Sequence, residues 1–492
     1  MTGNTLGWVI VAFVLYLLMM IAIGAFYAKG NNNSEDYFLG GRKLNGFVAA
    51  LSAQASDMSG WLLMGLPGAI YLTGVGGDGW IAIGLFIGTT LNWLFIATKL
   101  RRYTIRANNS VTLPTYFENR FHDEKKVLMT VSSITIVVFF LVYCASALSA
   151  GGQLFESVFG IDYHVALTIG ALVVLVYTFL GGFTAVCVTD FIQGMLMLGA
   201  LLIAPIFALF MLQGMGVHAV DTPDYFNAFS SWKDIVSGLG WGLGYFGMPH
   251  IIIRFMSLES QKSLKKSAKI GITWTVLIVI FAAAVGIIGR LFLGYDEAIN
   301  GHSLVFITMV RKIFPGVISG LLLSAVLAAS MSTADSQLLM AASAFASDVY
   351  KPVFRKGKAS DKEMMWAGRI VVLIISVVAL IIASNPNSGT IMSLVSNAWG
   401  VFGAAFGPAI MLSLFWKRFT FAGAVVSIIV GAAVDGLWLA FLSGTGIYEI
   451  IPAFAASMIA AIVASLLSKK PGKDVEELIR MVSSKGGTTI AG

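Results

Sequence analysis

The chain has 492 residues, of which 57% are hydrophobic and only 12% are charged. Apolar stretches of about 20 residues, the length needed to cross a bilayer as a helix, recur along it. This composition excludes a soluble globular protein and leaves no segment for a separate soluble domain. The formal net charge of +7 lies in short loops, where membrane topology explains it, so we expect no nucleic-acid partner.

The apolar stretches predict an all-α integral membrane protein with thirteen transmembrane helices. In chain order they cover residues 6–28, 46–72, 80–98, 127–155, 165–186, 189–212, 235–254, 270–293, 315–346, 366–384, 389–415, 420–443 and 448–468. The first stretch is too long for the core of a signal peptide and lacks a cleavage site, so we expect it to remain as a membrane span.

The basic residues predict how the chain is oriented. If successive loops alternate between the two sides of the membrane, one side carries only four of the 32 Lys and Arg, which are Lys233, Arg290, Arg311 and Lys312. By the positive-inside rule the opposite side, which carries all the other basic residues, is cytoplasmic. The sequence therefore predicts a multi-pass protein with its N-terminus outside and its C-terminus inside.

The second predicted span carries Ser-Asp-Met-Ser-Gly at 56–60, which places Asp57 and Gly60 at membrane depth. An intramembrane carboxylate indicates a functional site by default. Irregular backbone survives at this depth only when it is buried in protein or lines a cavity. The segment therefore predicts a broken helix beside a transported solute. A structural alternative is that Asp57 caps the second half-helix, where the helix dipole favours negative charge, and both roles are compatible.

The seventh predicted span is interrupted in the same way, because glycines alternate through 238–247 and Pro249 follows. Five spans separate the two interruptions, so spans 2 to 6 and 7 to 11 would form repeats of opposite orientation, each beginning with a broken helix. The glycines could instead allow close helix packing. The predicted division is 1–45 (first peripheral span and loop), 46–212 (repeat 1), 235–415 (repeat 2), 416–468 (peripheral spans 12 and 13) and 469–492 (cytoplasmic tail).

The ninth predicted span aligns Ala329, Ser332, Thr333 and Ser336 on one helix face, because three or four residues separate them. Their hydroxyls, with free carbonyls from the broken second span, would form a neutral oxygen cage. Such a cage suits a monovalent alkali cation better than Ca²⁺ or Mg²⁺, which usually recruit carboxylates. Alternatively, these hydroxyls bond back to their own helix or across to a neighbour.

Four runs of residues resemble the sodium:solute symporter family, and in particular its bacterial proline-transporting members. They are SDMSGWLLMGLPGA at 56–69, GWGLGYFGMPH at 240–250, LSAVLAASMST at 323–333 and DYFLGGR at 36–42. The resemblance extends from the first span to about residue 467. It implies a bacterial cytoplasmic-membrane protein that imports L-proline together with a sodium ion by alternating access, with no obligate protein partner evident.

The resemblance also implies which residues bind sodium. They are the carbonyls of Ala55, Met58 and Ala329 with the hydroxyls of Ser332 and Thr333, which matches the oxygen cage inferred from helix spacing.

Three charged residues resemble family positions linked to sodium coupling. Asp57 resembles the essential carboxylate. Asp190, at the predicted start of the sixth span, resembles an acid near the sodium exit path, although a helix cap is an equal alternative. Arg42 resembles a position linked to coupling on the inner side, although a plain positive-inside anchor is equally reasonable.

For the substrate, the half-helix that begins near Gly60 offers unpaired N–H groups and a positive dipole end to a carboxylate. Aromatic faces would suit the secondary ammonium and apolar ring of proline. The expected substrate residues are Ser59, Gly60, Trp61, Tyr143, Trp241, Tyr245, Pro249 and Ser336.

Other functions remain as alternatives. A symporter of the same class could carry pantothenate, another carboxylate or a sugar. A channel or a membrane sensor is a different class, but some 25 residues after the last span are too few for an output domain. An enzyme is not expected, because the polar residues contain no recognisable nucleophile–base pair or metal triad.

Overall fold

The computed structural model describes residues 3–28, 30, 33–296, 299 and 303–483, so the end of the predicted tail, 484–492, lies outside the described residues. These residues form helices and one isolated β-bridge, between Leu44 and Leu258. Ten of the described helical segments are long and apolar enough to cross a bilayer. The predicted all-α membrane architecture is therefore confirmed.

The longer helices are α1 (Gly3–Ala28), α3 (Gly46–Asp57), α4 (Leu66–Thr73), α5 (Gly79–Leu91), α6 (Thr98–Arg106), α7 (Leu113–Phe121), α8 (Val127–Phe159), α9 (Tyr163–Met215), α10 (Trp232–Gly244), α11 (Pro249–Ser257), α12 (Gln261–Leu293), α14 (Val305–Ile313), α15 (Gly316–Phe345), α16 (Asp361–Ser384), α17 (Ile391–Phe415), α18 (Phe421–Phe441), α19 (Ile450–Leu467) and α20 (Lys473–Ser483). Shorter elements include α2 (Ser34–Leu39), η1 (Gly40–Arg42), and the π-helical segments η2 (Trp61–Gly65), η3 (Asn92–Ala97) and η4 (Ala346–Phe354).

The ten continuous spans correspond to predicted spans 1, 3, 4, 6 and 8 to 13. The other three differ for identifiable reasons. Spans 2 and 7 are each split into two halves, α3 with α4 and α10 with α11, as the glycine interruptions predict. Span 5 is the first part of α9 and contributes a shorter apolar helix, Tyr163–Val176. The repeat boundaries 46–212 and 235–415 stay a prediction.

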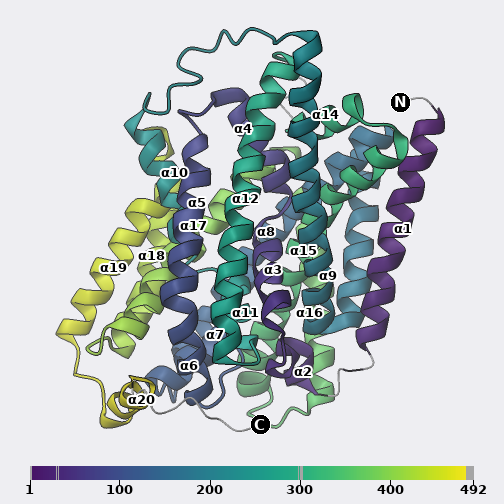
Figure 1. Ribbon diagram of the computed structural model, residues 1–492. Helices are drawn as coiled ribbons and strands as arrows, with labels where there is room; N and C mark the ends of the chain where they lie inside the picture. Colours follow the sequence, from purple (N-terminus) through teal and green to yellow (C-terminus); the bar gives the residue numbers. More distant parts are fainter. Residues whose placement is uncertain (1–2, 29, 31–32, 297–298, 300–302, 484–492) are drawn as a thin grey trace.

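The spans stand roughly side by side, with α4 and α14 at one end of the bundle and α2, α6 and α20 at the other (Figure 1). We refer to these ends as the α4 face and the α6 face. Helices α15 and α17 are the most enclosed, since 83% of the residues in their membrane windows are buried, compared with 28% for α1, α18 and α19. Side chains on α15 and α17 therefore face protein, where polar groups can be accommodated.

The boundary between spans 5 and 6 was predicted too late in the sequence. Helix α9 continues through residue 186, where the predicted span ends. The kink in this helix lies earlier, at Gly182, which has φ 67° and ψ −171°. Glycine adopts this backbone conformation because it has no Cβ to clash with the neighbouring carbonyl. Hydrophobicity alone gives no signal for the kink, because the residues around it are also apolar.

The glycines of span 7 serve both of the roles considered for them. An added Cβ on Gly84 of α5 would lie 2.1 Å from the carbonyl oxygen of Gly238, and one on Gly88 would lie 2.3 Å from that of Gly242. The first glycines of α10 therefore allow direct backbone packing against α5. The helix then breaks after Gly244, and α11 begins at Pro249, whose ring is tolerated in a first helical turn.

Candidate functional site

The break in span 2 frees backbone carbonyls at the centre of the bundle. Helix α3 ends at Asp57, Met58 adopts φ −87° and ψ 81°, and the chain resumes through the π-helical turn η2. In a regular helix the Ser59 N–H would bond to the Ala55 carbonyl, but here it donates to the Asp57 carbonyl at 3.1 Å. The Ala55 oxygen is therefore available to another partner.

That partner is the predicted hydroxyl face of span 9. The Ser332 hydroxyl lies 2.8 Å from the Ala55 carbonyl oxygen and 3.2 Å from the Ala329 carbonyl oxygen. The Thr333 hydroxyl is buried and has no hydrogen-bond partner among the described residues. An orphaned buried hydroxyl is costly unless a ligand satisfies it. With Met58 buried at the adjacent break, this cluster has the neutral oxygen chemistry of a monovalent cation site.

Asp57 joins the two broken helices. Its carboxylate accepts a hydrogen bond from the Tyr245 hydroxyl at 2.6 Å, and its other carboxylate oxygen has no partner among the described residues. The Asp57 carbonyl accepts bonds from Trp61 Nε1 at 3.2 Å and from the Tyr143 hydroxyl at 3.3 Å. The hydroxyl of Ser59 accepts the backbone N–H of Trp61 at 3.4 Å, so the Ser59 side chain, rather than the Asp57 carboxylate, caps the start of the second half-helix.

Aromatic side chains from both broken helices also pack at this junction. The rings of Trp61 and Trp241 are 5.9 Å apart, and Tyr245 meets Trp399 edge-on at 5.1 Å. Trp399 Nε1 also donates to the Trp241 carbonyl at 2.8 Å. Sequence reasoning missed Trp399, although a tryptophan in the middle of a span rather than at a membrane interface is a signal that could have identified it.

Two predicted substrate residues shape the backbone around these rings. A Cβ on Gly60 would lie 2.3 Å from the Ala150 Cβ of α8, so a larger residue would push the second half-helix away. Pro249 begins α11 directly after the second break.

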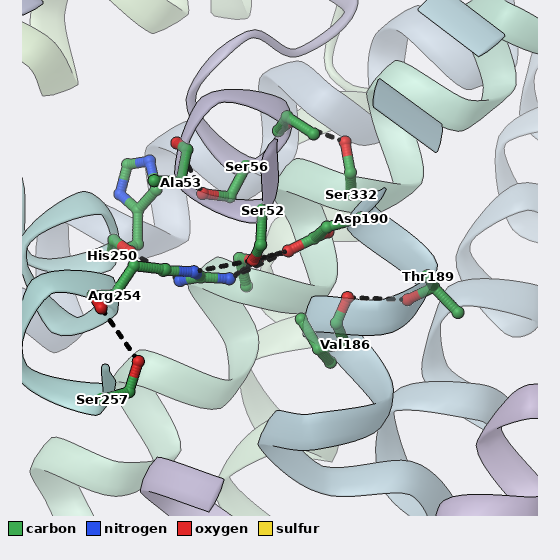
Figure 2. Close-up of polar contacts among 12 residues, drawn as sticks. Ser52, Ala53, Ser56, Val186, Thr189, Asp190, His250, Arg254, Ser257 and Ser332 are labelled. Atoms are coloured by element: carbon green, nitrogen blue, oxygen red, sulfur yellow. Dashed lines mark hydrogen bonds and ion pairs between the residues drawn. The ribbon is translucent and has the colours of Figure 1, made fainter. Parts of the chain in front are cut away.

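Ser336 lies in a different group of residues, around an ion pair buried inside the bundle. Arg254 Nη2 is 3.1 Å from Asp190 Oδ2, and both side chains are almost completely buried. Ser52 donates to the same carboxylate oxygen at 2.7 Å and accepts from Arg254 Nε at 3.1 Å. Ser336 accepts from Arg254 Nη2 at 2.5 Å. Figure 2 shows the Arg254 guanidinium directed at Ser52 and Asp190. The network thus joins α3, α9, α11 and α15.

Asp190 does not cap a helix, because it lies inside α9, well past the kink at Gly182. Sequence reasoning missed its partner Arg254, which is the last residue of predicted span 7. Because Arg254 follows three isoleucines and precedes Phe255 and Met256, a charge within an apolar stretch was the signal that could have identified it.

Arg42 lies on the α6 face and links three segments. Its guanidinium donates to Asn109 Oδ1 at 2.8 Å, to the Ser110 carbonyl at 2.6 Å and to the Met256 carbonyl at 2.5 Å. Burial lowers the pKa of Arg42 to about 10, so the side chain still carries its charge at neutral pH. The β-bridge between Leu44 and Leu258 adds a second link between the entry to α3 and the end of α11.

Two broken helices that meet at an intramembrane carboxylate, beside a hydroxyl-lined oxygen cluster, define a helical membrane transporter of the secondary-active class. The model of the sodium:solute symporter family matches residues 37–431, and the chain belongs to that family. Its members are symporters, so the expectation that the chain is not an enzyme is confirmed.

Proteins of known function are similar over nearly the whole length. The high-affinity proline transporter PutP of Bacillus subtilis (strain 168) is 46% identical over 468 residues, which cover 93% of this chain and 98% of PutP. A sodium/proline symporter of Staphylococcus aureus (strain USA300 / TCH1516) is 44% identical over 482 residues, covering 95% of this chain and 94% of that protein. An outward-open structure of a sodium-coupled sialic acid symporter has a TM-score of 0.77 at 22% identity, covering 94% of this chain and 98% of that one. This last likeness establishes the shared fold.

Proposed function

We propose that the protein imports L-proline coupled to sodium by alternating access. The names of the similar proteins support this assignment, because two of them are proline transporters matched over more than nine-tenths of their length. The observation that carries it is the junction at Asp57. Ser332 contacts the Ala55 carbonyl at this break, and the rings of Trp61 and Trp241 pack together beside it. A cation and an organic solute bound there would be neighbours.

In this mechanism sodium binds first, between the Ala55, Met58 and Ala329 carbonyls and the Ser332 and Thr333 hydroxyls. The ion would replace the hydrogen bond that now joins Ser332 to Ala55 and would hold α3 against α15. Asp57 supplies negative charge close to the ion, and its bond to Tyr245 links ion binding to the second broken helix.

Proline would then bind beside the ion. Its carboxylate is matched to the N–H groups that begin at Ser59 and Gly60, and its ring and ammonium to the aromatic faces. Trp61, Tyr143, Trp241 and Tyr245 contact or adjoin the Asp57 junction. Pro249 sets the second break. Ser336 is bonded to Arg254, so we assign it to the coupling network with Asp190 rather than to the solute pocket.

Coupling requires that neither ligand alone permits the full change of conformation. With one sodium ion per proline, a membrane potential of about 100 mV supplies about 2.3 kcal/mol. A tenfold sodium gradient adds about 1.4 kcal/mol. Together they would sustain a proline accumulation of roughly a few hundredfold.

For topology, we propose that the α6 face is cytoplasmic in a bacterial inner membrane, with the N-terminus outside and the C-terminus inside. The basic loops support this orientation. The contacts of Arg42 and the bridge at Leu44 would then close the inner side, so opening that side requires them to separate. Residues 46–212 and 235–415 would form the two repeats that move against each other.

The oxygen cluster predicts a selective effect on sodium. Ser332→Ala or Thr333→Ala removes one neutral ligand and should raise the sodium concentration for half-maximal uptake by about tenfold, corresponding to about 1.4 kcal/mol. Ser324→Ala is the matched control, because Ser324 is buried on the same helix but its hydroxyl bonds back to the Gly320 carbonyl at 2.9 Å. Sodium titrations that coincide for all three variants and the wild type would remove both hydroxyls from the site.

Trp241→Ala should instead weaken proline binding more than sodium binding, because it removes the ring that faces Trp61 at 5.9 Å. The expected loss in proline affinity is about tenfold or more, given aromatic contributions of about 0.5–1.5 kcal/mol beyond the buried area. Isothermal titration of proline at saturating sodium measures the effect. An unchanged dissociation constant would exclude Trp241 from the pocket.

The proposal as a whole is tested by uptake of radiolabelled L-proline into proteoliposomes under separate inward gradients of sodium, potassium or protons. Accumulation driven only by sodium and blocked by unlabelled proline is the expected result. Accumulation blocked instead by pantothenate, another carboxylate or a sugar would assign a different solute. Flux without accumulation would indicate a channel, and binding without flux a sensor.

A further inference from the structure

Two buried carboxyl groups lie outside this site, where α18 leads into α19. Asp435 is fully buried in α18, and Glu449, just before α19, is 8% exposed. Neither oxygen of Asp435 has a hydrogen-bond partner among the described residues, and the same holds for Glu449 Oε1. Burying a charged carboxylate without a partner is strongly unfavourable. These two groups therefore need either a positive charge nearby or a bound proton.

The helices packed around Asp435 do not supply that charge. Helix α17 contains no charged residue, and a Cβ on its Gly400 would lie 2.7 Å from Asp435 Oδ2. Glu449 brings negative rather than positive charge to this region, because Trp438 Nε1 of α18 donates to the Ile447 carbonyl at 3.2 Å and so holds the segment just before Glu449 against α18. Neither Asp435 nor Glu449 belongs to any ion pair of the described chain. The other titratable groups on the adjoining elements are Tyr448 beside Glu449, Tyr143 and Cys144 and the exposed Glu156 on α8, and Lys233 and Asp234 on α10. The Lys233 ammonium donates to the Thr445 carbonyl at 2.9 Å.

We propose that Asp435 and Glu449 form a proton-binding pair, in which Asp435 carries a proton taken up from the solvent at the α4 face. Two neighbouring carboxylates in a poorly solvated site cannot both ionise without a large electrostatic cost. A proton satisfies such a pair with no further ligand. An alkali cation would need several more oxygen atoms, whereas the residue facing Asp435 on α17 is a glycine.

The pair adjoins the candidate substrate site through Tyr448. The Tyr448 ring lies 5.2 Å from that of Trp241, its hydroxyl donates to the Ser396 carbonyl at 2.8 Å, and its N–H donates to the Ser237 hydroxyl at 3.1 Å. Ionising both carboxyl groups would separate the end of α18 from the start of α19 and draw Tyr448 away from Trp241. Outside pH would then regulate the site. This regulatory step rests on the proposed function, but the proton site itself does not.

Infrared difference spectroscopy of the purified, solute-free protein tests the proton site. The wild-type spectrum minus that of Asp435→Asn should contain the carbonyl stretch of a protonated carboxylic acid, which disappears as the pH is raised. Spectra of the two proteins that coincide at every pH would overturn the proposal. Glu156→Gln, which changes an exposed carboxylate on α8, is the matched control and should leave this band unchanged.

A second variant covers the case in which Asp435→Asn fails to fold. Glu449→Gln removes the neighbouring negative charge, so Asp435 should release its proton at lower pH than in the wild type. If the infrared band of Glu449→Gln disappears at the same pH as that of the wild type, the proposed proton-binding pair is overturned.

Sodium-driven uptake at different outside pH values tests the regulatory step. Wild-type uptake should fall on the order of fivefold as the outside becomes alkaline, the lower end of typical coupling between sites, whereas Asp435→Asn should show a flat profile. Coinciding pH profiles would overturn regulation. A protein that accumulates no solute would refute the proposed function, while the infrared result would still stand.

Discussion

Asp57→Ala is expected to reduce sodium-driven uptake by about a hundredfold or more, to the level of empty vesicles. Opposite charges 4 Å apart attract by about 4 kcal/mol at an effective dielectric constant of about 20, which is enough for a loss of this size. The substitution also removes the acceptor of the Tyr245 bond, measured at 2.6 Å, so the two broken helices lose their direct link. Uptake into proteoliposomes over a range of sodium concentrations measures the effect.

Two further variants separate the charge of Asp57 from its hydrogen bond. Asp57→Asn keeps an oxygen that can accept from Tyr245 but removes the charge, and Tyr245→Phe keeps the charge but removes the donor. If charge attraction dominates, Asp57→Asn should be nearly as inactive as Asp57→Ala, and Tyr245→Phe should retain most of the sodium response. The reverse order would show that Asp57 acts by holding the break together. Wild-type sodium dependence in Asp57→Ala would exclude both roles.

The parts of the site that sequence reasoning identified share one property, which is that a polar or irregular group interrupts an apolar run. Asp57 and the hydroxyls of Ser332 and Thr333 stand out for this reason. The cost of burying such groups makes them improbable without a function. The structure brings Ser332 to the Ala55 carbonyl, at 2.8 Å, as the shared helix face and the broken span predicted.

What sequence reasoning missed depends on contacts between distant segments. Arg254 is the last residue of predicted span 7 and received no role, and only the fold brings it beside Asp190 on α9. The kink at Gly182 depends on a backbone angle that hydrophobicity does not reveal. Spans 12 and 13 were treated as peripheral, so Asp435 received no attention. Its burial results from packing between α17 and α18, where Gly400 leaves room for the carboxylate.

Arg254→Met is expected to lower the free energy of unfolding by about 3–5 kcal/mol, the usual cost of removing one partner of a buried ion pair. The substitution would leave the Asp190 carboxylate in the bundle without its counter-charge, and Ser336 would lose the donor that now lies 2.5 Å away. Thermal or denaturant unfolding of the detergent-solubilised protein measures the loss. The deficit should shrink in acidic buffer, because a protonated Asp190 no longer needs a counter-charge.

The matched control is Arg355→Met, which breaks a surface ion pair with Glu363 of similar length, 2.7 Å, but with the arginine side chain 49% exposed. That change should cost about 0–1 kcal/mol, because water replaces the lost partner. Removing both buried charges, in Arg254→Met with Asp190→Leu, should recover much of the stability, since a well-packed apolar replacement for a buried pair is often neutral or favourable. If the loss of unfolding free energy in the double variant equals the sum of the losses in the two single variants, Arg254 and Asp190 do not act on each other. Recovered stability without recovered sodium-driven uptake would show that the pair is kept for coupling rather than for folding.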